Sequence, residues 1–127
     1  MTGKEPPIAF LRQLPPPNSR EQRQPCYPLS PTERLVIGRD PNCQVVLDSL
    51  MYRAVSRRHA DVGLVQGFEA PNGIRSWQVC DLDSANGTFV NGQRLQGCQI
   101  LQAGDRLMLA QNGPEFVFEC EPDPVSG

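Results

Sequence analysis

Short apolar segments separated by turn pairs dominate this chain and limit what it can fold into. Several of these segments alternate polar and apolar side chains, as residues 76–81 do. Asn-Gly pairs at positions 86–87 and 91–92 suit tight hairpin turns, because both residue types tolerate positive φ. No apolar stripe with helical periodicity runs for three turns. The pattern predicts an all-β sandwich, with strands among its expected elements at 34–38, 44–48, 76–81, 106–109 and 115–119.

Prolines are concentrated on the N-terminal side of this patterned body. Eight of the 13 prolines fall within the first 31 residues, and each fixes φ and removes a ladder donor. The apolar segment 8–14 nevertheless predicts a first strand, so we expect 15–25 to be a mobile proline-rich loop inside the domain. The alternative is a disordered leader of about 30 residues. We expect residues 1–6 to be disordered and 122–127 to be a flexible tail or linker.

Charge and hydropathy exclude several functional classes. Twelve basic and 14 acidic residues leave a net charge of −2 and a pI near 5.3, which argues against bulk electrostatic binding of nucleic acid. No apolar segment approaches the ~20 residues of a transmembrane helix. The N-terminus lacks a signal-peptide core, so we expect a cytoplasmic protein without membrane binding.

Five cysteines, at positions 26, 43, 80, 98 and 120, are scattered and form no C-x-x-C pair. We therefore expect reduced thiols, with neither a disulfide framework nor a zinc site. A Cys98–Cys120 pair is the alternative that the count leaves open.

Arginines gather where strands give way to loops. Arg39, Arg53, Arg57 and Arg58 supply four of the 12 basic residues. A local cationic site on an acidic protein suits a compact anion, and the planar arginine fork matches phosphate oxygens. A phosphorylated side chain carries about −1.5 to −2 charges at pH 7 and three strong acceptors. We expect Arg58 to lie on a solvated face, because neighbours on a strand point in opposite directions.

Three ordered motifs resemble those of the forkhead-associated (FHA) domain family. They are Gly38-Arg39, then Ser56-Arg57-x-His59, then Ser84-x-Asn86-Gly87-Thr88 followed by Val90-Asn91-Gly92. The resemblance implies a mostly antiparallel β-sandwich of about 11 strands, spanning residues 7–121, with binding loops at one end. It also implies binding of a phosphothreonine-containing protein or peptide, with no catalysis and no cofactor.

The resemblance assigns roles to individual positions. Arg39 and Ser56 are similar to the family's phosphate-binding residues, and Arg57 fills the adjacent phosphate- or peptide-contacting position. Asn86 is similar to the residue that hydrogen-bonds the peptide main chain. The positions expected to support the binding loops are Gly38, His59 and Gly87.

Two features depart from the family pattern. Ala85 stands where many members carry a hydrogen-bonding side chain, and losing one charge-assisted bond costs roughly 1.5–3 kcal/mol. The segment 49–55 is longer than usual, so we expect it to border the peptide groove. The expected secondary peptide contacts are Tyr52 and Arg53 in this segment, together with Ala85. The alternative is that Leu50, Met51 and Tyr52 pack back on the sandwich.

Other functions find less support in the sequence. A Ser56–His59 nucleophile pair would face opposite sides of an extended chain, and one histidine with scattered cysteines does not make a metal site. The main alternative is an FHA-fold scaffold or oligomerisation domain whose binding is independent of phosphorylation. For the isolated module we expect a monomer.

Overall fold

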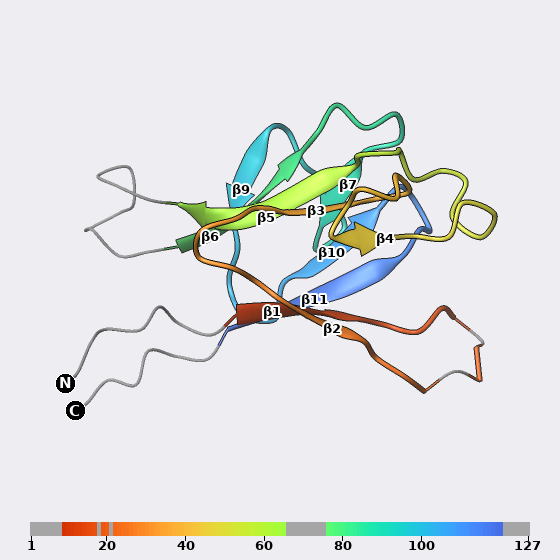
Figure 1. The fold of residues 1–127 in the computed structure, drawn as a ribbon, viewed down its shortest axis with the longest axis horizontal. Helices are drawn as coiled ribbons and strands as arrows, with labels where there is room; N and C mark the ends of the chain where they lie inside the picture. Colours follow the sequence, from red (N-terminus) through yellow and green to blue (C-terminus); the bar gives the residue numbers. More distant parts are fainter. Residues whose placement is uncertain (1–8, 18, 21, 66–75, 121–127) are drawn as a thin grey trace.

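Two β-sheets pack face to face in the computed structural model, which describes residues 9–17, 19–20, 22–65 and 76–120 (Figure 1). One sheet has six strands, in the order β2 (Cys26–Pro28), β1 (Ala9–Gln13), β11 (Glu115–Cys120), β10 (Arg106–Leu109), β7 (Thr88–Val90) and β8 (Gln93–Arg94). The other has five, in the order β4 (Val45–Val46), β3 (Leu35–Gly38), β5 (Ala60–Val65), β6 (Ser76–Asp81) and β9 (Cys98–Ile100). The described residues contain no helix, and all strand pairs except β3–β4 are antiparallel. The predicted all-β sandwich of about 11 strands is confirmed.

The expected first strand is present at Ala9–Gln13. It pairs with β11 from Ala9 opposite Cys120 to Gln13 opposite Phe116, and with β2 on its other side. The segment before the patterned body is thus part of the six-stranded sheet. The mobility expected for 15–25 and the domain range 7–121 stay predictions, while residues 1–6 and 122–127 lie outside the described residues.

Alternation along the strands builds the core. In β6, Trp77 and Val79 are buried while their neighbours are partly exposed, as the pattern predicted. Apolar side chains from both sheets meet between the layers. The largest fully buried apolar side chains are Phe116, Phe118, Leu11, Ile37, Leu107, Leu109, Val45, Val55, Val62 and Val79.

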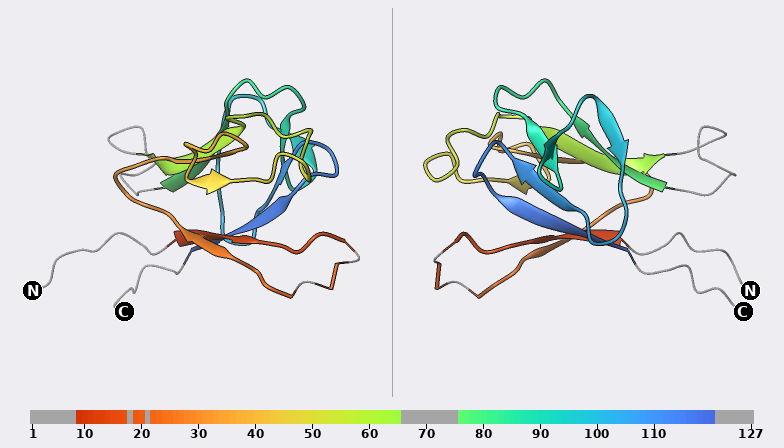
Figure 2. Two further views of the ribbon diagram at one scale, coloured as in Figure 1. Left: turned by 45° about the vertical axis from the view of Figure 1, so that its right-hand side comes forward. Right: turned by 180° about the vertical axis from the view of Figure 1, so that it is seen from behind.

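The connections between strands are unevenly placed. The β4–β5 and β10–β11 connections lie at one end of the sandwich, whereas the start of β1 and the end of β11 lie at the other (Figures 1 and 2). Asn91 and Gly92 have φ values of 50° and 86°, as the predicted tight turn between β7 and β8 requires.

Within the described residues, no helix is long and apolar enough to cross a bilayer.

The expectation that all five cysteines are reduced is wrong. Cys80 and Cys98 form a disulfide, so the alternative Cys98–Cys120 pair is wrong as well. The β6–β9 register places Cys80 directly opposite Cys98, with their Cα atoms 4.0 Å apart. Cysteine spacing along the chain does not reveal a partner on a neighbouring strand, and β9 is too short to show a pattern of its own.

Replacing Phe116 by alanine should test the core. Its side chain has no exposed surface, so Phe116→Ala should lower the free energy of unfolding by about 3–5 kcal/mol, through lost burial and the cavity left behind. Urea denaturation followed by tryptophan fluorescence measures this change. Leu50→Ala is the control, because Leu50 is 79% exposed and should change stability by less than about 0.5 kcal/mol. Equal losses in both variants would contradict this account of the core.

Candidate functional site

Gly38 ends β3 at a point where the backbone around Arg57 crosses it. The amide of Arg39 donates to the Ser56 carbonyl at 3.2 Å, and the amide of Asp40 donates to the Arg57 carbonyl at 2.9 Å. A Cβ atom at position 38 would lie only 2.0 Å from the Arg57 carbonyl oxygen. Glycine is therefore required here for Arg39 to lie beside Ser56.

The Arg39 side chain is held by its inner nitrogen. Its Nε donates to the Val55 carbonyl, and the side chain is only partly exposed. Among the described residues, no group forms a hydrogen bond with either Nη nitrogen. The outer end of the guanidinium is thus oriented and still able to donate to an anion.

Ser56 and Asn86 each connect two loops. The Ser56 hydroxyl oxygen accepts a hydrogen bond from the Ala85 amide at 3.0 Å, which leaves its own proton to donate. The Asn86 Nδ2 donates to the Ala54 carbonyl at 2.8 Å, which leaves its Oδ1 as an acceptor. The loop before β5 and the loop before β7 are therefore joined side by side, with a donor and an acceptor to spare.

His59 is fully buried beneath these loops. Its Nδ1 accepts a hydrogen bond from the Ser56 amide at 3.0 Å, so its Nε2 carries the proton and donates to the Gly87 carbonyl at 2.7 Å. Burial lowers the pKa of His59, and the bond to Gly87 and the charge of Asp81 only partly oppose this effect. The imidazole is a neutral brace between the two loops.

The expected extended geometry around His59 is wrong. Residues 56–59 form a bend ahead of β5, so Ser56 and His59 contact each other and do not face opposite sides. The contact runs through the Ser56 amide, not through its hydroxyl. Because both imidazole nitrogens are engaged, His59 is not placed to take a proton from the Ser56 hydroxyl. Arg58, expected on a strand, lies exposed in the same bend.

The loop that carries Ala85 and Asn86 depends on Asp81, which the sequence did not single out. The Asp81 carboxylate accepts hydrogen bonds from the amide and hydroxyl of Ser84, at 3.1 and 2.6 Å, and from the Thr88 hydroxyl at 2.7 Å. Burial raises the pKa of Asp81, but these hydrogen bonds outweigh it and the pKa falls below its usual range. A carboxylate just upstream of a Ser-x-x-x-Thr spacing was the available sequence signal.

Gly87 closes this loop in a left-handed conformation, with φ of 88°. Its amide donates to the Ser84 hydroxyl at 3.0 Å, and its carbonyl accepts from the buried His59. The support roles expected for Gly38, His59 and Gly87 are consistent with these contacts.

Arg57 and Arg53 add positive charge on the loop before β5. Arg57 has a 69% exposed side chain and forms an ion pair with Asp40, with Nη2 and Oδ2 3.1 Å apart. The pKa of Asp40 lies below its usual range, first because the Asn42 amide donates to its carboxylate and then because of Arg57. Arg53 is exposed as well. Asp40 thus restrains Arg57 and offsets part of its charge.

The segment 49–55 projects from the same end of the sandwich. The Asp48 carboxylate accepts from the amides of Leu50 and Met51, at 2.8 and 2.9 Å, which forms a tight turn. Leu50 and Met51 are 79% and 65% exposed, so the alternative of packing back is wrong for them. Tyr52 does pack against the core. Its expected contact with a peptide, like that of Arg53, stays a prediction.

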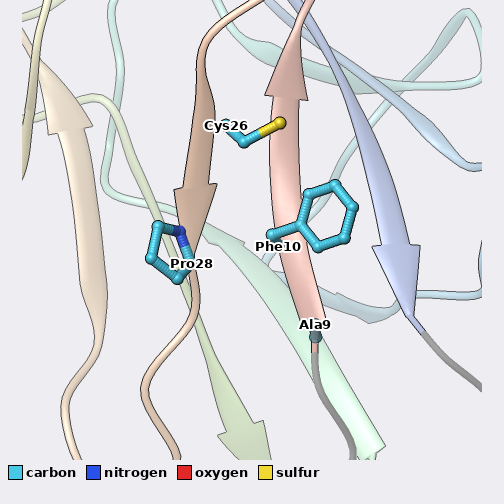
Figure 3. Close-up of a pocket in the computed structure, with 4 residues that line it drawn as sticks. All are labelled: Ala9, Phe10, Cys26 and Pro28. Atoms are coloured by element: carbon cyan, nitrogen blue, oxygen red, sulfur yellow. The ribbon is translucent and has the colours of Figure 1, made fainter.

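These residues form an open loop surface. The structure has a shallow apolar hollow elsewhere, on β1 and β2, lined by Ala9, Phe10, Cys26 and Pro28 (Figure 3). That hollow has no charged lining. It includes Ala9, the first residue of β1, and the start of β1 lies at the end of the sandwich opposite the loops. In the part of the chain that the structure describes, no three His, Cys, Asp or Glu side chains gather as metal ligands.

Comparisons with known proteins agree with the observed fold. The sequence profile of the FHA domain matches residues 35–110, and no curated protein matches the chain. The MEK1 FHA domain has a TM-score of 0.70 at 27% identity over 89% of each chain. Its complex with a HOP1 phosphothreonine peptide has a TM-score of 0.66 at 26% identity, over 89% of this chain and 96% of that one. Mycobacterium tuberculosis EmbR with a low-affinity phosphopeptide has 28% identity and a TM-score of 0.65, over 88% of this chain and 24% of EmbR.

Lowering the pH should lower the free energy of unfolding through the buried His59 imidazole. Because the pKa of His59 is lower in the folded state than in the unfolded state, its contribution to stability is present above about pH 6.5 and is lost as the pH falls below it. The free energy of unfolding should fall by at most about 1.4 kcal/mol per pH unit in this range. Urea denaturation between about pH 5 and pH 7 measures the slope, since most carboxylates titrate lower.

His59→Gln is the matched variant for this experiment. It should be less stable near pH 7, and its stability should show a much smaller slope, because the chain has one histidine. An unchanged slope in the variant would show that another group is responsible.

Proposed function

Because the chain belongs to the FHA domain family, we propose that it is a binding module for phosphothreonine in a partner protein or peptide. The observation that carries this proposal is the convergence of Arg39 and Ser56, whose backbones are hydrogen-bonded at 3.2 Å. Among the described residues, the Arg39 Nη nitrogens and the Ser56 hydroxyl proton have no acceptor within the protein. A doubly ionised phosphate needs such an arrangement of a cationic fork and a neutral hydroxyl.

Each side chain has a role in the proposed complex. Arg39 donates from its Nη nitrogens and Ser56 from its hydroxyl to the phosphate oxygens, while Arg57 adds a charge already oriented by Asp40. The Asn86 Oδ1 accepts from a main-chain amide of the peptide beside the phosphothreonine. Ala85 offers no side-chain donor, so the phosphate relies on the other three residues.

Related proteins support a phosphopeptide as the ligand. The MEK1 FHA domain binds a HOP1 phosphothreonine peptide, and EmbR binds a phosphopeptide with low affinity. Both share more than a quarter of their aligned residues with this chain, at 26% and 28% identity.

The proposal includes the wider setting expected from the sequence. The module, spanning 7–121, acts as a monomer in cytoplasmic signalling, without catalysis and without binding to nucleic acid or membrane. The engaged nitrogens of His59 support the absence of a Ser–His nucleophile, and the acidic net charge of −2 supports the absence of a nucleic-acid ligand.

Removing either phosphate donor should weaken binding strongly. Against a phosphothreonine peptide selected from a degenerate library, Arg39→Ala and Ser56→Ala should each reduce affinity by about 10- to 150-fold, the loss of one charge-assisted hydrogen bond. Isothermal titration calorimetry measures the affinities. Arg58→Ala, a neighbouring exposed arginine, is the control and should lose less than about threefold. A loss in the control as large as in Arg39→Ala would reject the assigned roles.

The state of the ligand should decide binding. The same peptide with phosphoserine should bind about fourfold more weakly if the threonine methyl is buried, since one methyl contributes about 0.8 kcal/mol. Affinity for the phosphothreonine peptide should also fall below about pH 6, where the phosphate regains its second proton, and fall in high salt. Equal affinity for the threonine and phosphothreonine peptides would favour a phosphate-independent scaffold.

A further inference from the structure

The Cys80–Cys98 disulfide joins the edge strand β9 to its neighbour β6. β9 pairs with β6 alone, and its three residues, Cys98, Gln99 and Ile100, are all exposed. The strand therefore buries no side chain of its own in the core. Its position depends on the backbone ladder and on this covalent bond.

The same bond lies next to the residue that organises the candidate site. Asp81 follows Cys80 directly, and its amide donates to the carbonyl of Gly97, the residue before Cys98, at 2.9 Å. The Asp81 carboxylate holds Ser84 and Thr88 at 2.6 and 2.7 Å. One residue thus joins the fastened edge strand to the loop before β7.

That loop makes the contacts on which Ser56 depends. The Ala85 amide donates to the Ser56 hydroxyl at 3.0 Å, and Asn86 donates to the Ala54 carbonyl at 2.8 Å. A shift of the loop would change the direction of the Ser56 hydroxyl and of the free Asn86 oxygen. An unbroken series of short contacts therefore runs from the disulfide to the site.

The surroundings of Cys80 favour opening of the bond by a thiol. An Arg34 Nη2 nitrogen lies 3.4 Å from the Cys80 sulfur and 2.7 Å from the Asp61 carboxylate, which orients it. A guanidinium stabilises a neighbouring thiolate and so makes Cys80 the better leaving sulfur. Cys98 is an exposed residue and Cys80 is only partly exposed, which favours Cys98 as the sulfur that an incoming thiolate attacks.

We propose that Cys80 and Cys98 are a thiol–disulfide modification site that sets the affinity of the phosphothreonine site, a proposal that rests on the proposed function. A dithiol reductant attacks the Cys98 sulfur as a thiolate, and the electron pair of the broken bond leaves on Cys80. The second thiol of the reductant then attacks the reductant's own sulfur in the mixed disulfide and releases Cys98 as a thiolate. In total, the reductant transfers two electrons and two protons and becomes a disulfide, and two thiols form on the protein. A small-molecule disulfide reverses the exchange.

The proposed cytoplasmic setting gives this chemistry a use. Disulfides in the cytoplasm of mesophilic organisms are usually transient and serve catalysis or redox sensing. In this chain the oxidised form holds the loop, and the reduced form lets the start of β9 and Asp81 move. Oxidation therefore raises affinity for the phosphorylated partner.

The first test compares redox states of one protein. The oxidised and dithiothreitol-reduced chains are titrated with the library-selected phosphothreonine peptide, after thiol counting confirms the state of the bond. We expect reduction to weaken binding on the order of 2- to 30-fold, the range by which changes along a network of contacts alter the coupling between two sites. Cys80→Ser/Cys98→Ser should bind as the reduced chain does and ignore the reductant. Cys26→Ser, which removes an exposed thiol outside the disulfide, should respond as the natural chain does.

The second test needs no ligand. Backbone amide resonances of residues 81–88 are compared between the two redox states by NMR, with circular dichroism to show that both remain folded. Shifts at Ala85 and Asn86 support the coupling. Unchanged resonances there, together with unchanged affinity after the bond has opened, overturn it.

These two readouts separate the two proposals. If no phosphothreonine peptide binds the oxidised chain, the proposed function fails and the affinity claim falls with it. If the oxidised chain binds phosphothreonine and reduction changes nothing, only the redox inference fails.

Discussion

The buried imidazole of His59 joins the two loops that carry the candidate site. It accepts from Ser56, which precedes a strand of the five-stranded sheet, and donates to Gly87, which precedes a strand of the six-stranded sheet. The Gly87 carbonyl also accepts from the Ala110 amide at 2.8 Å, so a third loop is attached at the same oxygen. A single neutral side chain thus sets how loops from both layers meet, and every contact proposed for a phosphate depends on that meeting.

Residues of the candidate site each combine a structural hydrogen bond with a polar atom that is left for a ligand. Ser56 and Asn86 each use one polar atom to brace a neighbouring loop and keep another for a ligand. Arg39 does the same with its Nε and Nη nitrogens. Because the protein's own hydrogen bonds join the loops, the proposed binding has less conformational entropy to overcome.

The sequence predicted β6, β10 and β11 because their alternating side chains reflect burial on one face, and it predicted strands at 34–38 and 44–48 because these segments are apolar. In the second of these segments the structure has only the two residues of β4. The sequence did not predict β7, β8 and β9, which have two or three residues and form because their neighbours position them. β5 was missed because Asp61, buried beside Arg34, and Gly63 interrupt its apolar pattern. The Cys80–Cys98 bond was missed for a related reason, since strand register decides it.

The motifs predicted which residues gather at the binding end, but not how they contact one another. Ser56, His59 and Gly87 stood out by type and order, and the structure brings them together. The direction of each hydrogen bond depends on the bend at residues 56–59, which no local sequence pattern predicted. Asp81 escaped notice because its role comes from hydrogen bonds formed only after the loop has closed.

The pairing of Ala9 with Cys120 has a mechanical consequence. Both residues lie at the start of one antiparallel ladder, at the end of the sandwich away from the loops. Tension applied through the flanking chain would peel β1 from β11 one residue pair at a time, beginning at that corner. The loops of the candidate site lie beyond this ladder, so they would carry no load until β1 and β11 had separated.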